Sequence, residues 1–368
     1  MSEYDFAVIG AGIAGASIAA ELAPHASVLL VEAEDTPGYH TTGRSAAFYH
    51  ECYGGPQVAP LSLASGPALR ELGVLSPRGS LYIGRAADAP LLEQYVARFA
   101  GSGAVIERVG RPELERRIPG LRPEWTLGLY EPACADIDVA ALHQHYLTQA
   151  RRAGAELRVS ARVEAAEREG GGWRLGFARG GEARARVLVN AAGAWADEVA
   201  TLAGARPSGV TPLRRTIAQL RTDPPAPADL PLVLDINSRF YFKPEHGRLW
   251  LSPEEETPSP PCDAAPEEID VAIAIDRFEQ VVDWKVQAVE RKWAGLRSFA
   301  PDRLPVYGFD AERAAGRDGL FWFAGQGGFG IQTAPAAARL AAQLILGSPR
   351  DTMTERLDAA LYSPARFA

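Results

Sequence analysis

Three glycines near the N-terminus have the spacing that lets a backbone close on a phosphate group. Gly10, Gly12 and Gly15 follow a short apolar run, Phe6 to Ile9, and precede a stretch with helical spacing. In such a motif the first glycine permits a tight turn, the second admits a pyrophosphate, and the third lets the helix pack on the strand. The helix N-terminus then offers N–H groups and a partial positive charge to the phosphates.

An acidic residue stands where a bound ribose would need it. Val28 to Val31 is a second buried apolar run, and Glu32 follows it directly. A carboxylate at this place accepts hydrogen bonds from a ribose 2′-hydroxyl and disfavours a 2′-phosphate. The order of strand, glycine turn, helix, strand and acid therefore predicts a dinucleotide site and argues against NADP. The alternative is a glycine turn that serves packing alone.

Two later segments favour FAD over NAD, which the glycine motif does not separate. Residues 190–195 close a buried strand with small side chains and leave room for a nucleotide. Residues 325–333 form a glycine-dense turn before a helical pattern. Such a turn can direct N–H groups at the polar edge of an isoalloxazine, and the positive helix end would stabilise the anionic reduced flavin. A tight turn followed by a packing helix is the alternative here.

Further motifs identify a family. The chain resembles the D-amino-acid oxidase/dehydrogenase family of flavoproteins, and within it the bacterial D-arginine dehydrogenase type. The resemblance covers nearly the whole chain and rests on residues 38–47, 135–138, 141–144, 190–195, 240–244, 293–299 and 327–333. It implies oxidation of a D-amino acid to the imino acid by hydride transfer to flavin N5, and hydrolysis to a 2-oxo acid and ammonia.

The resemblance also assigns roles to substrate-binding residues. Arg297 stands among apolar residues, where a planar guanidinium is either part of a buried ion pair or a bidentate clamp for a carboxylate. It matches the family's carboxylate-binding arginine. Arg215, favoured over its neighbour Arg214, matches another active-site arginine. Tyr53 and Tyr241 match tyrosines of the substrate pocket, with core packing as the alternative.

Two positions depart from the D-arginine type. Phe48 replaces a histidine, and Ser80 stands near the place of an acid that would neutralise a cationic side chain. We therefore expect a less polar pocket without that counter-charge, and a neutral or apolar substrate. His50 could restore polarity or handle a proton; a surface position is the alternative for this histidine. No dedicated base for the substrate amine is evident, and a dry, positively charged pocket would itself favour the neutral amine.

The remaining predicted site residues belong to the cofactor, FAD, bound without a covalent link. Ser45 could instead cap a helix. The full set predicted to bind FAD is Gly10, Gly12, Ile13, Ala14, Gly15, Glu32, Ala33, Thr42, Gly43, Arg44, Ser45, Ala46, Ala47, Val163, Ala192, Gly193, Trp195, Gly325, Gly327, Gly328, Phe329, Gly330, Ile331 and Gln332.

These residues require an α/β fold with two domains. We expect a Rossmann-like FAD domain from residues 1–79, 139–212 and 302–368, and a substrate domain from residues 80–138 and 213–301 built on a mixed, mostly antiparallel sheet. Residues 136–153 have the pattern of a helix. The segment 253–268, with five prolines and six acidic residues, is predicted to be an exposed, mobile excursion. A lid over the arginines is the sharper alternative for this segment.

Composition narrows the partners. A net charge of −8 argues against nucleic acid and anionic membrane surfaces. Three scattered cysteines make neither a disulfide framework nor a metal cluster, which favours a cytoplasmic protein. No apolar run reaches the ~18 residues that cross a bilayer. We expect an amino-acid substrate, a quinone, other carrier or O₂ as electron acceptor, no metal, and a monomer or weak homo-oligomer.

Three alternative functions stay open at this stage. The same scaffold could oxidise glycine- or sarcosine-type amines, or a 2-hydroxy acid, because an arginine clamp suits any carboxylate. A flavin-binding module without turnover is an alternative of another class, although it has no need of a carboxylate clamp. An NAD-dependent dehydrogenase is the third, and a yellow purified protein would exclude it.

Overall fold

The first of three sheets carries the predicted dinucleotide motif. The computed structural model describes residues 3–310 and 319–367. At the centre of this sheet, parallel strands run in the order β9-β2-β1-β12-β20, and antiparallel strands flank them. Its strands are β1 (Glu3–Ile9), β2 (Val28–Val31), β9 (Glu156–Arg158), β10 (Val163–Glu169), β11 (Gly172–Phe177), β12 (Glu182–Asn190), β19 (Val306–Phe309) and β20 (Leu320–Ala324).

Both faces of this sheet are covered, which explains its uniformly apolar central strands. Alternate residues of β1 enter different cores: Phe6 and Val8 pack with three helices, while Ala7 and Ile9 pack on the other face with α6 (Ala196–Leu202). The three helices are α1 (Ile13–Leu22), α5 (Val139–Arg152) and α8 (Gly330–Leu346). A fourth helix, α2 (Ala59–Glu71), packs on α8.

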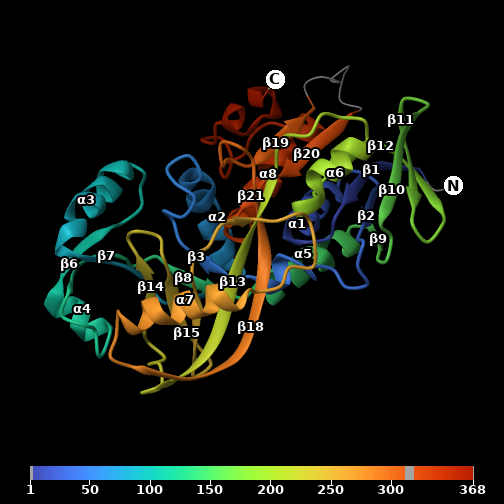
Figure 1. Cartoon of the computed structure of the whole chain (residues 1–368). Coiled ribbons are helices and arrows are strands. Elements are labelled where there is room, and N and C mark those ends of the chain that lie inside the picture. The colour runs from blue at the N-terminus through green and yellow to red at the C-terminus, as the bar shows by residue number, and fades with distance from the viewer. Residues whose placement is uncertain (1–2, 311–318, 368) are drawn as a thin grey trace.

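The second sheet is larger and mostly antiparallel. Figure 1 shows that two long strands of this sheet, β13 and β18, extend toward the helices that cover the first sheet. Helices α3 (Ala89–Arg98), α4 (Arg111–Arg117) and α7 (Glu268–Glu279) accompany it. Its strands are β21 (Gln326–Gly327), β18 (Lys285–Phe299), β13 (Thr211–Asp223), β16 (Arg248–Ser252), β15 (Tyr241–Glu245), β14 (Leu232–Asp235), β5 (Ser80–Arg85), β7 (Trp125–Glu131), β6 (Glu107–Gly110) and β17 (Thr257–Pro258).

A third, small sheet joins segments from both predicted domains. It pairs β8 (Ala135–Ile137) with β3 (Phe48–Tyr49) and β4 (Leu75–Pro77). The α/β fold class with one Rossmann-like and one mostly antiparallel sheet is confirmed. The division at residues 79/80, 138/139, 212/213 and 301/302 stays a prediction.

Two predictions about local structure are wrong. The helix predicted from residue 136 starts at Val139, because Asp136 lies in β8 and Asp138 caps the helix by accepting a bond from Ala141 N at 2.9 Å. The segment 253–268 is not exposed throughout. It contains the short strand β17, and the side chains of Glu254 and Glu255 are only 14% and 10% exposed.

Candidate functional site

One cavity brings the predicted cofactor and substrate residues together. It is lined at one end by the glycine turn and Glu32, and elsewhere by Tyr53, Arg215 and Arg297. The predicted cofactor residues that line it are Gly10, Gly12, Ile13, Ala14, Glu32, Ala33, Thr42, Arg44, Ser45, Ala46, Ala47, Val163, Ala192, Gly193, Trp195, Gly327, Gly328, Gly330, Ile331 and Gln332.

Four predicted cofactor residues do not line the cavity and instead shape its wall. A Cβ on Gly15 would overlap the carbonyl oxygen of Gly10, so this glycine lets the helix approach the turn. Gly43 and Gly325 likewise serve chain conformation: a Cβ on Gly43 would lie 2.9 Å from Gly38 O, and Gly325 has a φ of +69°. Phe329 is 2% exposed and packs in an apolar cluster.

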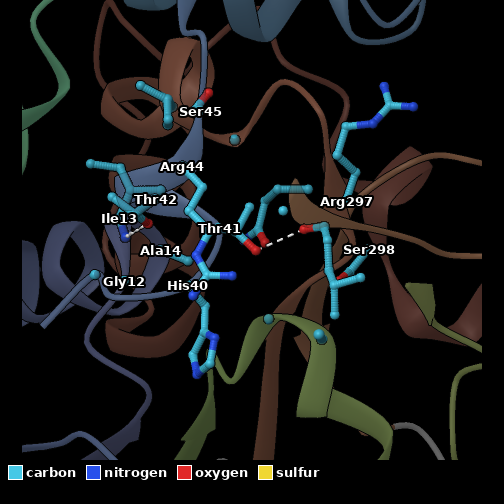
Figure 2. A pocket seen from close by; sticks show the side chains of 18 of the residues that line it. Gly12, Ile13, Ala14, His40, Thr41, Thr42, Arg44, Ser45, Arg297 and Ser298 are labelled. Carbon is cyan, nitrogen blue, oxygen red and sulfur yellow. Dashed lines mark hydrogen bonds between the residues drawn. The ribbon is translucent and has the colours of Figure 1, made fainter. Parts of the chain in front are cut away.

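The cofactor end is organised by backbone N–H groups. Glu32 accepts hydrogen bonds from Ala11 N at 2.9 Å and Glu34 N at 3.0 Å, which orient its carboxylate and leave lone pairs for a ribose. Figure 2 shows the Ile13 N–H pointing at Thr42, whose Oγ1 accepts from it at 3.0 Å. Thr42 therefore already satisfies one donor of the helix N-terminus that the sequence predicted to be free for phosphate.

The substrate end is a row of side chains across the large sheet. Tyr82 on β5 pairs with Leu234 on β14, and Leu234 pairs with Tyr241 on β15. Directly paired residues share a face of a sheet, so all three project the same way. They line the cavity together with Ile217 and Phe48, and Phe48 contacts Tyr241 edge-on with ring centroids 5.7 Å apart.

Strand register also places two arginines on this face. Arg215 on β13 pairs with Gly295 on β18, two residues before Arg297 on the same face. Arg214 points to the other side, where it pairs with Glu267 and Asp270. Of the two neighbouring arginines, Arg215 is thus the one that lines the cavity, as favoured from the sequence.

Arg297 combines satisfied and free donors. Its Nη1 donates to Tyr53 Oη at 2.9 Å, and its Nη2 donates to Glu256 at 2.8 Å. Its buried Nε has no hydrogen-bond partner among the described residues. A buried donor without an acceptor is costly, and a ligand carboxylate would supply one. A Cβ on Gly328 would overlap the Tyr53 hydroxyl, so the glycine turn closes directly on this pair.

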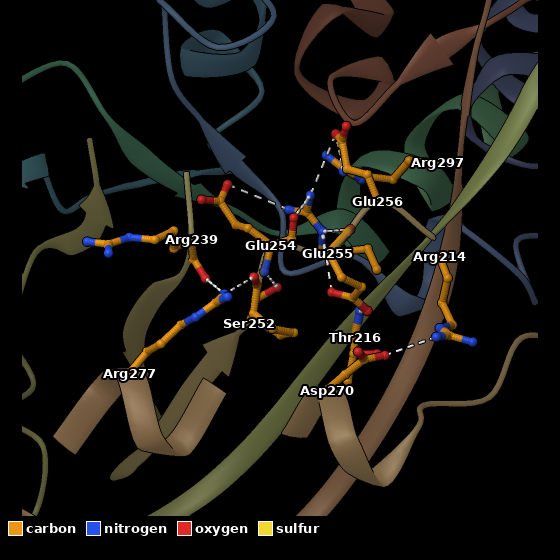
Figure 3. Close-up of polar contacts among 12 residues, drawn as sticks. Arg214, Thr216, Arg239, Ser252, Glu254, Glu255, Glu256, Asp270, Arg277 and Arg297 are labelled. Carbon is orange, nitrogen blue, oxygen red and sulfur yellow. Dashed lines mark hydrogen bonds and ion pairs between the residues drawn. The ribbon is translucent and has the colours of Figure 1, made fainter. Parts of the chain in front are cut away.

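Arg215 is held by the segment that follows β16. Its Nη2 donates to the backbone oxygen of Glu254 and its Nε to that of Glu255, both at 3.1 Å. Figure 3 shows Glu256 beside Arg297, whereas Arg214 lies apart from the three glutamates and next to Asp270. Arg215 thereby fixes a stretch of three acidic residues against the cavity.

The same segment reaches a third arginine. Arg44 donates to Ala264 O at 2.9 Å and to Ala294 O at 3.2 Å, and it forms an ion pair with Asp263. Contacts with three cavity arginines hold the segment against the site. The proline and glutamate content of the segment predicted an exposed excursion. That prediction failed because composition does not reveal ion pairs with residues distant in the sequence.

Two predicted site residues lie outside the cavity. Ser80 is fully buried on β5, two residues before Tyr82, so it lies one step further from the ligand on the same face. His50 is also fully buried, which excludes the surface alternative, and its ring packs edge-on against Tyr82 at 5.7 Å. Burial lowers the pKa of His50, although Glu131 nearby opposes this shift. One position missed in the sequence is Tyr82, for which strand alternation from Ser80 was the available signal.

The expectation of a pocket without a counter-charge is wrong. Glu254 lines the cavity beside Arg215 and Tyr241. Burial raises its pKa, and the nearby guanidinium groups of Arg215 and Arg297 oppose the shift. Burial also raises the pKa of Tyr241 to about 12, so its hydroxyl is a neutral donor at physiological pH. The site is thus mixed in charge and not uniformly positive.

Comparison with known proteins decides the family. The model of FAD-dependent oxidoreductases named DAO matches residues 5–344. The chain belongs to this family. FAD is accordingly its cofactor, and the glycine turn, Glu32 and the 325–332 turn would hold it. The narrower resemblance to the D-arginine dehydrogenase type is not supported: the similar structures described next carry other activities.

Solved structures share the fold over the full chain. Glycine oxidase from Geobacillus kaustophilus is 25% identical with a TM-score of 0.83, covering 100% of this chain and 99% of that one. L-proline dehydrogenase from P. horikoshii is 21% identical with a TM-score of 0.85, covering 100% and 98%. Iminodiacetate oxidase from Chelativorans sp. BNC1 is 24% identical with a TM-score of 0.80, covering 98% of each.

Curated relatives match over shorter stretches. Hydrogen cyanide synthase subunit HcnC of Pseudomonas aeruginosa is 27% identical over 237 residues, which is 61% of this chain and 53% of the relative. Rat mitochondrial dimethylglycine dehydrogenase is 28% identical over 264 residues, 67% of this chain and 30% of the relative. The chain thus spans about half or less of these proteins. Within the described ranges, no helix has the length and apolar character to cross a membrane.

Proposed function

We propose that this flavoprotein oxidises the carbon–nitrogen bond of a small α-amino acid, a D-amino acid with a neutral or apolar side chain. The observation that carries the proposal is the buried guanidinium of Arg297. It lies beside the Tyr53 hydroxyl in the same cavity as the flavin-binding turns and has an unused Nε donor. A forked, charged donor of this kind suits the carboxylate of an amino acid.

Residues of the chain bind and orient the substrate in this proposal. Arg297 and Tyr53 hold the carboxylate, which must displace Glu256 from Nη2 of Arg297. Tyr241 stays protonated and donates from the same face of the sheet. Positioning of this kind can contribute several kcal/mol to lowering a barrier. When bound, FAD supplies the oxidant that accepts two electrons with the hydrogen of the α-carbon. Water then hydrolyses the imino acid to a 2-oxo acid and ammonia.

The lining of the cavity supports a neutral side chain. Phe48, Tyr82, Ile217 and Leu234 form an apolar wall next to Tyr241. A substrate side chain of similar character would bury apolar surface there at roughly 25 cal/mol per Å². The absence of an acidic residue is no longer a reason to expect a neutral substrate, because Glu254 lines the cavity. The reason is now the apolar wall.

A secondary amine is the second candidate. It is supported by the names of two similar proteins, L-proline dehydrogenase and iminodiacetate oxidase, and a third, dimethylglycine dehydrogenase, is named for a tertiary amine. Each substrate named there carries both a carboxylate and a substituted amine nitrogen, which the clamp of Arg297 and Tyr53 would accept equally well.

A substrate screen tests the proposal. The yellow holoenzyme is assayed with an artificial electron acceptor and with O₂ against D- and L-amino acids, sarcosine, proline, iminodiacetate and 2-hydroxy acids. We expect turnover with at least one neutral D-amino acid and production of ammonia. Turnover of secondary amines alone would support the second candidate. If 2-hydroxy acids alone react, or if no compound reduces the flavin, the proposal is wrong.

A further inference from the structure

The carboxyl group of Glu254 has no place in the proposed chemistry so far. Glu254 lies two residues after the last residue of β16, Ser252, and its φ of +56° turns the chain sharply at this point. Its side chain is 14% exposed and lines the cavity between the arginines and Tyr241. Few non-glycine residues adopt a left-handed backbone, and such residues concentrate at functional sites.

The three consecutive glutamates have different partners. The carboxylate of Glu255 accepts a bond from Thr216 N, and that of Glu256 accepts from Arg297 and Arg303. The carboxylate of Glu254 accepts no hydrogen bond from the described residues. Its nearest cation, Nη1 of Arg215, is 3.6 Å away, which is longer than a hydrogen bond. Arg215 instead donates two hydrogen bonds to the backbone oxygens of residues 254 and 255.

A buried carboxylate in this state favours a cationic ligand. Removing a charged group from water is costly unless it is paired and hydrogen-bonded. Arg215 supplies an opposite charge at 3.6 Å but no hydrogen bond to this carboxylate. An ammonium group in the cavity would provide the missing hydrogen bond, with three N–H donors and a positive charge of its own. Arg297 lines the same cavity as Glu254. The cavity therefore presents a guanidinium and a carboxylate side by side, which matches the two charges of an amino acid zwitterion.

We propose that Glu254 binds the substrate ammonium and thereby selects amino acids over carboxylic acids that lack an amine. This inference rests on the proposed function and deepens it. Arg297 and Tyr53 bind one end of the zwitterion and Glu254 binds the other, while the apolar wall receives a neutral side chain. The arrangement discriminates against 2-hydroxy acids, which leave the carboxylate of Glu254 without an ammonium donor in a buried site.

Ligand binding to the Glu254→Gln holoenzyme tests the assignment. Binding is followed anaerobically through the visible flavin spectrum, with a neutral amino acid and with acetate as the probe without an amine. Loss of a charge-assisted hydrogen bond should weaken amino-acid binding about 10- to 100-fold. Acetate should bind with unchanged or higher affinity, because a negative charge beside Arg297 is removed. Glu267→Gln, which removes a negative charge from the exposed end of the same segment, serves as the matched control.

The outcomes separate this inference from the proposed function. Unchanged amino-acid affinity in Glu254→Gln, or equal weakening of amino acid and acetate, overturns the role of Glu254. Failure of every amine to reduce the wild-type flavin overturns the proposed function instead, and the binding comparison with acetate still tests Glu254. If the glutamine variant does not fold, Glu254→Asn removes the charge with a residue that tolerates positive φ.

Discussion

The two ends of the cavity are built in different ways. At the cofactor end, the groups come from segments close in sequence: the backbone turn at residues 10–15 follows β1, and the Glu32 side chain follows the neighbouring parallel strand β2. At the substrate end, the groups are side chains from distant segments. Tyr53, Arg215, Glu254 and Arg297 meet through the pairing of β13 with β18 and through the 253–268 segment.

This contrast predicts which end of the cavity tolerates substitution. A backbone cradle tolerates few changes of sequence, since a side chain at a glycine position obstructs the ligand or the chain itself. A pocket of side chains changes its preference whenever one side chain changes. Substitutions at the two ends should therefore fail in different ways.

The largest effect is expected at the cofactor end. In Gly15→Ala, the new methyl group would overlap the carbonyl oxygen of Gly10 and force the helix away from the turn. We expect loss of bound FAD, measured as flavin absorbance per protein after purification. Gly319→Ala is the matched control, because nothing lies within 4 Å of its Cβ. A Gly15→Ala protein that purifies with full FAD would contradict the cradle.

Loss of the clamp should leave the cofactor in place. Arg297→Ala removes the charged donors for the substrate carboxylate and leaves Glu256 without one of its three arginines. We expect kcat/KM to fall about 100- to 1,000-fold, mainly through KM, at unchanged FAD content. Arg303→Ala, which removes only the exposed partner of Glu256, is the control. Nearly unchanged kinetics in Arg297→Ala would show that the arginine has a structural role alone.

How far the sequence predicts the site follows the same division. The glycine turn and Glu32 are predictable because strand, turn and acidic residue follow one another in a local pattern that is typical of dinucleotide binding. Arg297 required the family resemblance, since an arginine among apolar residues is equally consistent with a buried ion pair. Glu254 could not be predicted. Its neighbours are prolines and acids typical of an exposed loop, and only the contacts with Arg215 bring it into the cavity.

Removal of the internal competitor should have a smaller and opposite effect. Glu256 occupies Nη2 of Arg297, and its side chain is 38% exposed, so solvent screens the pair. Glu256→Gln should lower KM for the amino acid by about two- to fivefold, because the substrate no longer displaces a carboxylate. Steady-state kinetics at low ionic strength provide the measurement. A raised KM would show that Glu256 supports the clamp and does not compete for it.

The smallest effect is expected behind the substrate wall. Burial lowers the pKa of His50 in the folded protein. At a pH just below the ordinary histidine pKa of about 6.5, His50 is therefore protonated in the unfolded chain but still neutral in the folded protein. The contribution of neutral His50 to the free energy of unfolding is fully present above that pH, and it is lost as the pH falls toward the pKa of His50 in the folded protein. His50→Gln should reduce the loss of unfolding free energy between pH 7.5 and 5.5 by about 1 kcal/mol.

Urea unfolding at the two pH values measures this difference. Because His143 is also buried with a lowered pKa, part of the dependence should remain in the variant. An unchanged difference between the two pH values would exclude His50 as a source of the acid sensitivity.

Anaerobic flavin reduction in the wild-type holoenzyme is the most direct test of the account. A neutral D-amino acid is compared with the corresponding amine that lacks the carboxylate, under identical conditions. Because Arg297 and Tyr53 hold the carboxylate, the amino acid should bleach the flavin at least about 100-fold more efficiently. Equal bleaching by the two compounds, or no bleaching by any amino acid, would contradict the claim that this cavity holds a carboxylate against the flavin.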